Sequence, residues 1–222
     1  MGNLVFKGGT ALRKAYFPDY RLSADLDFTV LEGDRTTLKK SVSTLENQEL
    51  EGISFLGLAD KTLKGANNLN LVLQYESKIG TTPGKRHVDN VKMDFNFDNK
   101  VCLKPEKRTI VSPKEFELEE FPMNVMQLEE MICDKIHAIH RRPKPRDLYD
   151  LLYLLKTGHR INVELANKKL ESMGGKFEIE GFARHMEKLR AKWETDMKGL
   201  LPFVPDFDTM AAETLRMMKT RL

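Results

Sequence analysis

The chain has 222 residues, of which 41% are hydrophobic and 31% charged, a composition typical of a folded globular protein with a sizeable core. The net charge of +3 is small, so it permits a nucleic-acid partner without indicating one. No apolar run approaches the about 20 residues that a membrane helix needs, and the N-terminus lacks the pattern of a secretory signal. Cys102 and Cys133 lie outside any disulfide or zinc-binding spacing. We therefore expect a cytoplasmic protein with no membrane partner.

The N-terminal part of the chain predicts a mixed sheet with few helices. Residues 4–6 form a short apolar strand that Gly8 and Gly9 end, and residues 10–17 then favour a helix. Residues 25–30 alternate between apolar and polar side chains, which predicts a half-buried strand. The same periodicities predict a surface helix at residues 36–45 and strands at residues 53–58, 69–75 and 88–97.

The period of the apolar residues becomes helical after a proline- and lysine-rich stretch around Pro105 and Pro113. Apolar residues recur at helical spacing from Leu128 to Ile139. A basic turn at residues 141–146 leads into the next helix. The further helices that we expect lie at residues 146–156, 163–173, 178–198 and 209–222. The fold class predicted is α+β, with a small mixed β-sheet core at residues 1–104 and a mostly helical C-terminal half at residues 105–222.

Lys7, Gly8, Gly9 and Thr10 open the first predicted helix. Glycines let a backbone approach a ligand closely, and the free N–H groups of a helix start favour a phosphate. Thr10 could add a hydroxyl contact. The alternative is a plain turn, because two glycines before a helix are common without any ligand.

Asp25 and Asp27 lie two residues apart on a predicted strand, so their side chains point to the same face. Two carboxylates so placed can hold divalent metals, and Mg²⁺ prefers a few carboxylates together with substrate phosphates. A solvated strand face with two charges is the alternative.

Asp94 lies on the polar side of a separate predicted strand. If that strand neighbours the first, Asp94 completes a carboxylate triad suited to two-metal phosphoryl transfer. It would then act on the nucleophile as a metal ligand or a base. Otherwise Asp94 is a solvent-facing aspartate.

Three charged residues of the helical half have two interpretations each. Lys135 lies on or beside the apolar stripe of its helix, where a lysine either extends its ammonium to the edge or faces a phosphate. Asp147 and Asp150 lie at a helix start, where they could cap the helix or act in a site. The basic residues at 141–146, 168–169 and 188–192 could contact an RNA backbone or cover a solvated surface.

These features together resemble the AbiEii/AbiGii nucleotidyltransferase toxin family of the polymerase-β-like superfamily. The resemblance spans residues 4–156 in order and spacing. It rests on residues 6–12 (FKGGTAL), residues 21–28 (RLSADLDF), Leu128 to Met131 with Lys135, and residues 146–151 (RDLYDL). Family members commonly have a helical segment before the first strand, whereas three residues precede Leu4 here.

The resemblance implies three groups of site residues. They are the nucleotide-binding Gly8, Gly9 and Thr10, the Mg²⁺-binding Asp25, Asp27 and Asp94, and the charged Lys135, Asp147 and Asp150, of which Lys135 would neutralise the triphosphate. Mn²⁺ is the alternative metal.

The implied function is a Mg²⁺-dependent nucleotidyltransferase that transfers NMP from an NTP to an acceptor hydroxyl, with the 3′ end of tRNA as the leading acceptor. The protein would be the toxin of a type IV toxin–antitoxin or phage-defence system and would have a cognate antitoxin. A protein or an antibiotic-like small molecule is the alternative acceptor. A different class of protein, a non-catalytic binding module with the same fold, is the other alternative. A tRNA enzyme should need the basic turn at residues 141–146, whereas a small-molecule enzyme should not.

Overall fold

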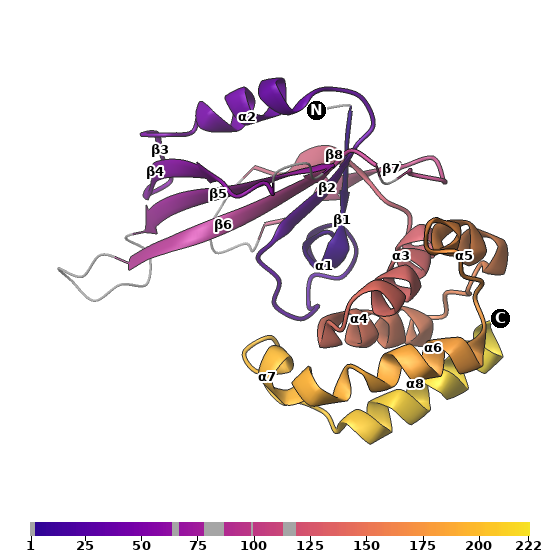
Figure 1. The fold of residues 1–222 in the computed structure, drawn as a ribbon. Helices are drawn as coiled ribbons and strands as arrows, with labels where there is room; N and C mark the ends of the chain where they lie inside the picture. The colour runs from indigo at the N-terminus through magenta and orange to yellow at the C-terminus, as the bar shows by residue number, and fades with distance from the viewer. Residues whose placement is uncertain (1–2, 64–66, 78–86, 99, 113–118) are drawn as a thin grey trace. The chain divides into compact units, whose positions relative to one another are not determined.

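The computed structural model describes residues 3–63, 67–77, 87–98, 100–112 and 119–222, and the chain divides into two compact units (Figure 1). The first unit comprises residues 1–101 and 105–125, and the second comprises residues 102–104 and 126–222. The sequence suggested a division at residue 104. The first unit instead extends to Val125, because strands β7 (Glu106–Ile110) and β8 (Phe121–Val125) pair into its sheet.

The first unit is built on one eight-stranded mixed sheet with the strand order β3-β4-β5-β6-β2-β1-β8-β7. Strand β1 pairs in parallel with β8, and β2 pairs in parallel with β6, whereas the other neighbours are antiparallel. The remaining strands are β1 (Leu4–Lys7), β2 (Leu26–Val30), β3 (Glu49–Leu50), β4 (Ile53–Asp60), β5 (Asn68–Ser77) and β6 (His87–Asn96).

All five strands expected from the sequence are present, and β3, β7 and β8 are additional. Strand β7, at the edge of the sheet, carries mostly polar side chains. Strand β8 alternates apolar and polar positions, but it has only five residues and one of them is a proline, a residue that argues against a strand between two neighbours.

Two helical segments accompany the sheet. Helix α1 (Gly8–Ala11) begins directly after β1 and continues as a π-helix (Leu12–Tyr16). Helix α2 (Arg35–Ser43) follows β2, and its N-cap Asp34 accepts a hydrogen bond of 3.0 Å from the Thr37 backbone N–H. Helix α2 lies alongside β4 in the first unit (Figure 1).

The alternation of β1, β2 and β6 divides apolar from polar side chains. Phe6, Phe28 and Phe95 stack across the three strands, with consecutive ring centroids 5.2 Å apart. Because successive side chains of a strand point to opposite faces, this stack directs Asp27 and Asp94 to the other face of the sheet. The aromatic stack therefore fixes which face carries the predicted site.

The second unit is helical, as the sequence predicts. Its helices are α3 (Leu128–Arg141), α4 (Pro145–Lys156), α5 (Val163–Leu170), α6 (Ile179–Glu187), α7 (Trp193–Met197) and α8 (Phe207–Arg221). The single helix expected over residues 178–198 is interrupted after α6. The interruption lets Trp193 pack edge-on against Phe207 and donate a hydrogen bond of 2.7 Å to the Pro205 carbonyl.

A buried ionic cluster attaches residues 102–104 to the helices of the second unit. The fully buried carboxylate of Glu130 accepts hydrogen bonds from the backbone N–H groups of Cys102 (2.8 Å) and Leu103 (2.9 Å). Lys169 Nζ lies 2.6 Å from Glu130 and 2.9 Å from Asp134. Burial by itself lowers the pKa of Lys169, but the two carboxylates outweigh it and raise that pKa above its ordinary value.

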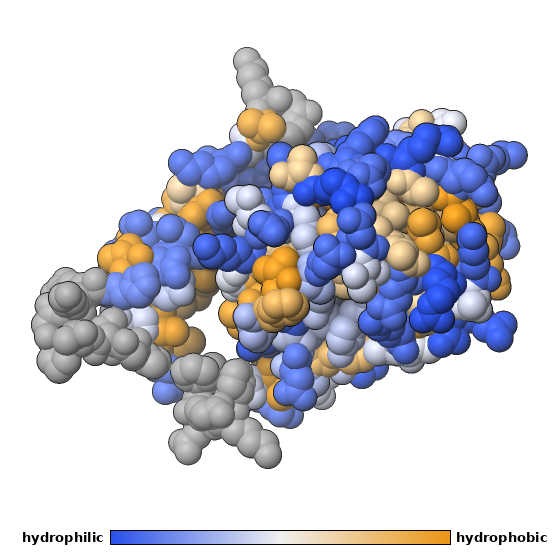
Figure 2. All heavy atoms as spheres, turned by 90° about the horizontal axis from the view of Figure 1, so that it is seen from below, coloured by the Kyte–Doolittle hydropathy of each residue, from blue (hydrophilic) through white to orange (hydrophobic). Residues whose placement is uncertain are grey.

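The surface seen from below is mostly hydrophilic, with apolar residues in separate groups between the polar ones (Figure 2). The most exposed large apolar side chain of the described residues is Phe203, at 79%. In the same part of the chain, no helix combines the length and the apolar composition that crossing a membrane requires.

Replacing Lys169 by Met should lower the free energy of unfolding by about 3 kcal/mol, because a fully buried Glu130 then loses its counter-charge. Urea denaturation followed by circular dichroism measures the change. The matched control is Lys168→Met: Lys168 is the exposed neighbour, and its replacement should change stability by less than about 0.5 kcal/mol. Equal losses in the two variants would contradict the assignment.

Candidate functional site

Asp27 and Asp94 lie directly opposite each other on parallel neighbouring strands. The register pairs Asp27 of β2 with Asp94 of β6, at the strand spacing of about 4.8 Å. The condition that the sequence left open, that these two strands be neighbours, is therefore met. Lys7 at the end of β1 pairs with Asp27 from the other side.

Asp25 lies just before β2 and is held by the first helix. Thr10 Oγ1 lies 2.5 Å from the Asp25 carbonyl oxygen and 2.9 Å from Ser23 Oγ. The Thr10 side chain is buried, so its hydroxyl fixes the segment that leads into β2. Its contact with a phosphate stays a prediction.

The two glycines lie where a side chain would not fit. Gly8 has φ +78°, and a Cβ atom added there would lie 2.5 Å from Asp27 Oδ2. A Cβ atom at Gly9 would lie 2.7 Å from Arg21 Nη2 and 2.9 Å from Ser23 Oγ. The backbone of this turn thus lies directly against one of the predicted metal-binding carboxylates, which is what a phosphate-binding turn next to a metal site requires.

Arg21 is a further candidate for the site, to which the sequence motifs alone assigned no role. Its side chain is buried beside Gly9, with its guanidinium 5.5 Å from the Tyr20 ring centroid and its Nη1 donating to the Leu22 carbonyl at 2.9 Å. A buried guanidinium next to a glycine turn is suited to a phosphate. The sequence feature that could have indicated Arg21 is its position two residues before Ser23 and four residues before Asp25.

Two asparagines of β5 extend the polar face beyond Asp94. Asn70 pairs in register with Asp94, and Asn68 Nδ2 donates to Asp94 Oδ1 at 3.5 Å. The strand predicted over residues 69–75 includes Asn70 without a role and begins one residue after Asn68.

The carboxylates fit a metal that arrives with a phosphorylated substrate. Within the described ranges, no three His, Cys, Asp or Glu side chains are gathered into a set that could hold an ion by itself. Asp27 and Asp94 supply two carboxylates from adjacent strands, and Mg²⁺ characteristically combines one or two carboxylates with substrate phosphates and water. The two carboxylates therefore suit a metal ion whose other ligands come from the phosphates of a nucleotide and from water.

The other three predicted charged residues lie together in the second unit. Lys135 Nζ lies 2.8 Å from Asp147 Oδ1 and 2.6 Å from Asp150 Oδ2, and all three side chains are buried. Burial by itself lowers the pKa of Lys135, but the two carboxylates outweigh it and raise that pKa, so the lysine stays charged. Arg142 of the basic turn reaches Asp147 Oδ2 at 3.5 Å. These contacts give the triad a structural function within the helices.

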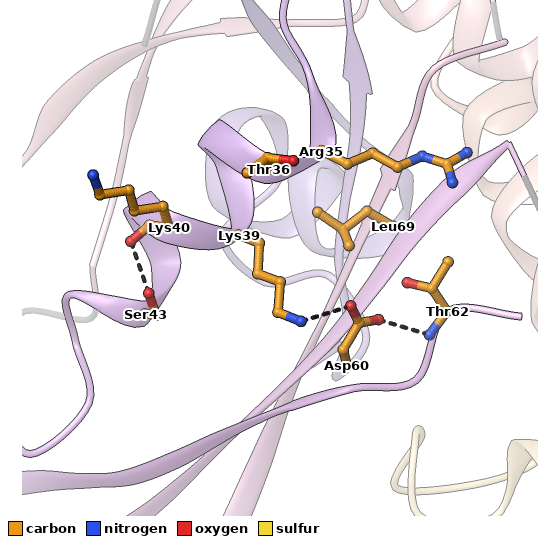
Figure 3. A pocket seen from close by; sticks show the side chains of 8 residues that line it. All are labelled: Arg35, Thr36, Lys39, Lys40, Ser43, Asp60, Thr62 and Leu69. Atoms are coloured by element: carbon orange, nitrogen blue, oxygen red, sulfur yellow. Dashed lines mark hydrogen bonds and ion pairs between the residues drawn. The ribbon is translucent and has the colours of Figure 1, made fainter. Parts of the chain in front are cut away.

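A separate basic pocket of about 530 Å³ lies between α2 and strands β4 and β5 (Figure 3). Lys39 extends across it to Asp60, which also accepts a hydrogen bond from the Thr62 backbone N–H. Leu69 lines the pocket, and its register partner is Phe95 of the aromatic stack. The pocket thus lies on the face of the sheet opposite Asp27, and none of the predicted site residues lines it.

Comparisons with known proteins identify the family and a solved structure of similar fold. The family model described as nucleotidyl transferase AbiEii toxin, type IV TA system, matches residues 1–213. The fold is similar to that of MenT4, a nucleotidyltransferase toxin from Mycobacterium tuberculosis H37Rv, with a TM-score of 0.68 and 20% sequence identity over 98% of this chain and 74% of that chain. Among curated protein sequences the chain has no match.

Replacing Gly8 by Ala should reduce nucleotide binding at least tenfold, because the new methyl group would displace the Asp27 carboxylate. The matched control is Gly52→Ala, since Gly52 has a similar φ of +76° and nothing within 4 Å of the added Cβ. Both variants should lose about 1 kcal/mol of stability from the left-handed backbone. Calorimetric titration with each NTP should detect the loss of binding only in Gly8→Ala. A similar loss in both variants would contradict the assignment of the glycine turn as the phosphate-binding site.

Replacing Lys135 by Met should lower the free energy of unfolding by about 3–5 kcal/mol, because two buried carboxylates then lose the lysine that lies between them. The control is Lys156→Met, which removes an exposed ion pair with Glu213 and should cost at most about 1 kcal/mol.

The pH dependence has a definite sign. Because the pKa of Lys135 is raised in the folded protein, its stabilisation is complete below the ordinary value of 10.5 and is lost as the pH rises through the folded value. The stabilities of wild type and Lys135→Met should therefore converge only above pH 10.5. Convergence near neutral pH would contradict the ion-pair assignment.

Proposed function

The chain belongs to the AbiEii family of nucleotidyltransferase toxins of type IV toxin–antitoxin systems, and from this premise we propose that it transfers NMP from an NTP to the 3′ end of tRNA in a reaction that depends on Mg²⁺. The family implies an NTP substrate and a cognate antitoxin. The observation that carries the proposal is the glycine turn packed against Asp27, with Asp94 directly opposite on the next strand.

The turn at Gly8 and Gly9 binds the phosphates of the NTP. Its backbone can approach a phosphate because neither position has a side chain, and the buried Arg21 guanidinium beside Gly9 neutralises charge there. Thr10 keeps this turn and the segment before β2 in one arrangement through its hydroxyl. The triphosphate is thus oriented before the reaction starts.

Asp25, Asp27 and Asp94 would hold Mg²⁺, or Mn²⁺ as the alternative, which when bound supplies charge stabilisation for the phosphoryl group and lowers the pKa of the attacking hydroxyl. The acceptor oxygen forms a bond to the α-phosphorus while the bond from that phosphorus to the bridging oxygen breaks, and pyrophosphate leaves. Asp94 lies on the strand farther from the glycine turn, so its carboxylate is the one placed to receive the proton of the acceptor hydroxyl.

The acceptor and the location follow from the family resemblance. A protein or small-molecule acceptor is the alternative, as is a non-catalytic binding module. The phosphate-side role of Lys135 and the part played by Asp147 or Asp150 stay predictions of the same resemblance, and a cytoplasmic location is expected.

Incubating the protein with tRNA, Mg²⁺ and each α-³²P-labelled NTP should put label on tRNA with at least one nucleotide, resolved on a denaturing gel. Asp27→Asn and Asp94→Asn should each reduce labelling by about 10³-fold or more, since each removes one of the two negative charges of the Asp27–Asp94 pair that would bind the metal. Chelation by EDTA should abolish labelling.

The matched control is Asp89→Asn, which removes an exposed carboxylate from the same strand β6 but from its other face. It should retain wild-type labelling. Label on proteins or on a small molecule but not on tRNA would show that the acceptor is not tRNA. Full activity of both Asp27→Asn and Asp94→Asn would refute the proposed metal-binding site.

A further inference from the structure

The order of the strands places the parts of the candidate site in sequence across the sheet. The glycine turn follows β1, Asp27 lies on β2, Asp94 on β6, and β5 comes next in the sheet. In an in-line displacement the attacking oxygen and the leaving pyrophosphate lie on opposite sides of the phosphorus. With the phosphates on the β1 side, the acceptor must therefore approach from the side of β6 and β5.

Strands β5 and β6 continue well beyond β2 on that side. Each has ten residues, whereas β2 has five and pairs only with Met93–Asn96 of β6 (Figure 1). Within the described part of the chain, the preceding residues of β6, His87–Lys92, pair with β5 alone. Strand β5 also pairs with β4 over this stretch, so a three-stranded extension of the sheet, made of β4, β5 and β6, leads away from the carboxylates.

Over its first three register pairs, the face of this extension that continues from Asp94 is polar except for Val72. These pairs are Asn70 with Asp94, Val72 with Lys92, and Gln74 with Asn90. The exposed members are Lys92, Gln74 and Asn90. The opposite face carries the buried side chains Leu69, Leu71, Leu73 and Met93, so the polar face is held in one orientation by the core.

We propose, on the basis of the proposed function, that this polar face of β5 and β6 binds the acceptor as a single-stranded RNA end, with Lys92 contacting a phosphate and Asn70, Gln74 and Asn90 contacting riboses and bases. Amide side chains both donate and accept hydrogen bonds, as base edges and ribose hydroxyls require. One lysine among amides supplies the phosphate contact without a strongly basic surface.

The length of the face favours a polymer over a small acceptor. The Gln74–Asn90 pair lies four residues from the Asn70–Asp94 pair, which is about 13 Å along a strand. A small molecule at the metal site would contact only the nearer pair. The polar face therefore favours an RNA acceptor among the candidates that the sequence left open.

The test compares acceptor binding with nucleotide binding in the full chain. Lys92→Ala should raise KM for tRNA about tenfold, because the loss of one charge-assisted hydrogen bond weakens binding by about that factor. The same variant should leave KM for the NTP within about twofold. The slope of log K against log salt for binding of fluorescein-labelled tRNA should fall by about one. Gln74→Ala combined with Asn90→Ala should also raise KM for tRNA without changing the salt slope.

The matched control is Lys40→Ala, which removes an exposed lysine from α2, next to the pocket on the opposite face of the sheet. It should bind tRNA as the wild type does. Equal weakening in Lys40→Ala and Lys92→Ala would overturn the proposal, because a general charge effect would then explain both.

Binding and label transfer separate the two proposals. Transfer to tRNA with unchanged tRNA binding in Lys92→Ala would overturn the acceptor face and leave the proposed function standing. Weakened tRNA binding in Lys92→Ala without any transfer by the wild type would support the face and refute the proposed function. Absence of both transfer and RNA binding in the wild type would refute both.

Discussion

The parallel pairing of β2 with β6 is the constraint on which the candidate site depends. It places Asp27 opposite Asp94, and the aromatic stack of Phe6, Phe28 and Phe95 on the other face prevents a slip of the register. A shift by one residue would bury the carboxylates and expose the aromatic rings, so the hydrophobic core selects the arrangement that the chemistry needs. The same strand pairing thus supports the hydrophobic core on one face of the sheet and positions the candidate site on the other.

Charge is used differently in the two units. In the first unit Asp27 and Asp94 share one face of the sheet, where under the proposed function a bound metal ion would supply the compensating positive charge. In the second unit the carboxylates of Glu130, Asp147 and Asp150 are buried against lysines of the same unit. Such pairs add little net stability compared with apolar packing, but losing one partner is costly, so they specify one packing of the helices. Loss of activity after mutation of Lys135 would therefore need a stability measurement beside it.

The sequence predicted the elements whose side chains alternate or recur with a clear period. It placed Asp27 and Asp94 at polar positions of two such strands, but only the structure shows that these strands are neighbours. It missed β7, whose side chains are mostly polar, and β8, a five-residue strand whose alternation includes a proline. Arg21 was missed as a site residue because its role depends on the turn of the backbone around Gly9, a relation between positions twelve apart in the chain. Lys135 was placed beside the apolar stripe, but its partners Asp147 and Asp150 belong to the next helix, and spacing within one helix cannot reveal them.

Residues 102–104 have a consequence for the order in which the chain folds. They belong to the helical unit, yet they precede two strands of the α/β unit in synthesis. The α/β unit is complete once residue 125 has left the ribosome, while Cys102 and Leu103 must wait for Glu130 to accept their N–H groups. The chain therefore contributes residues to the second unit before the first unit is complete. A fragment that begins at residue 126 would lack the backbone N–H groups that the fully buried Glu130 carboxylate accepts, so the second unit cannot be cut out of the chain as one continuous piece.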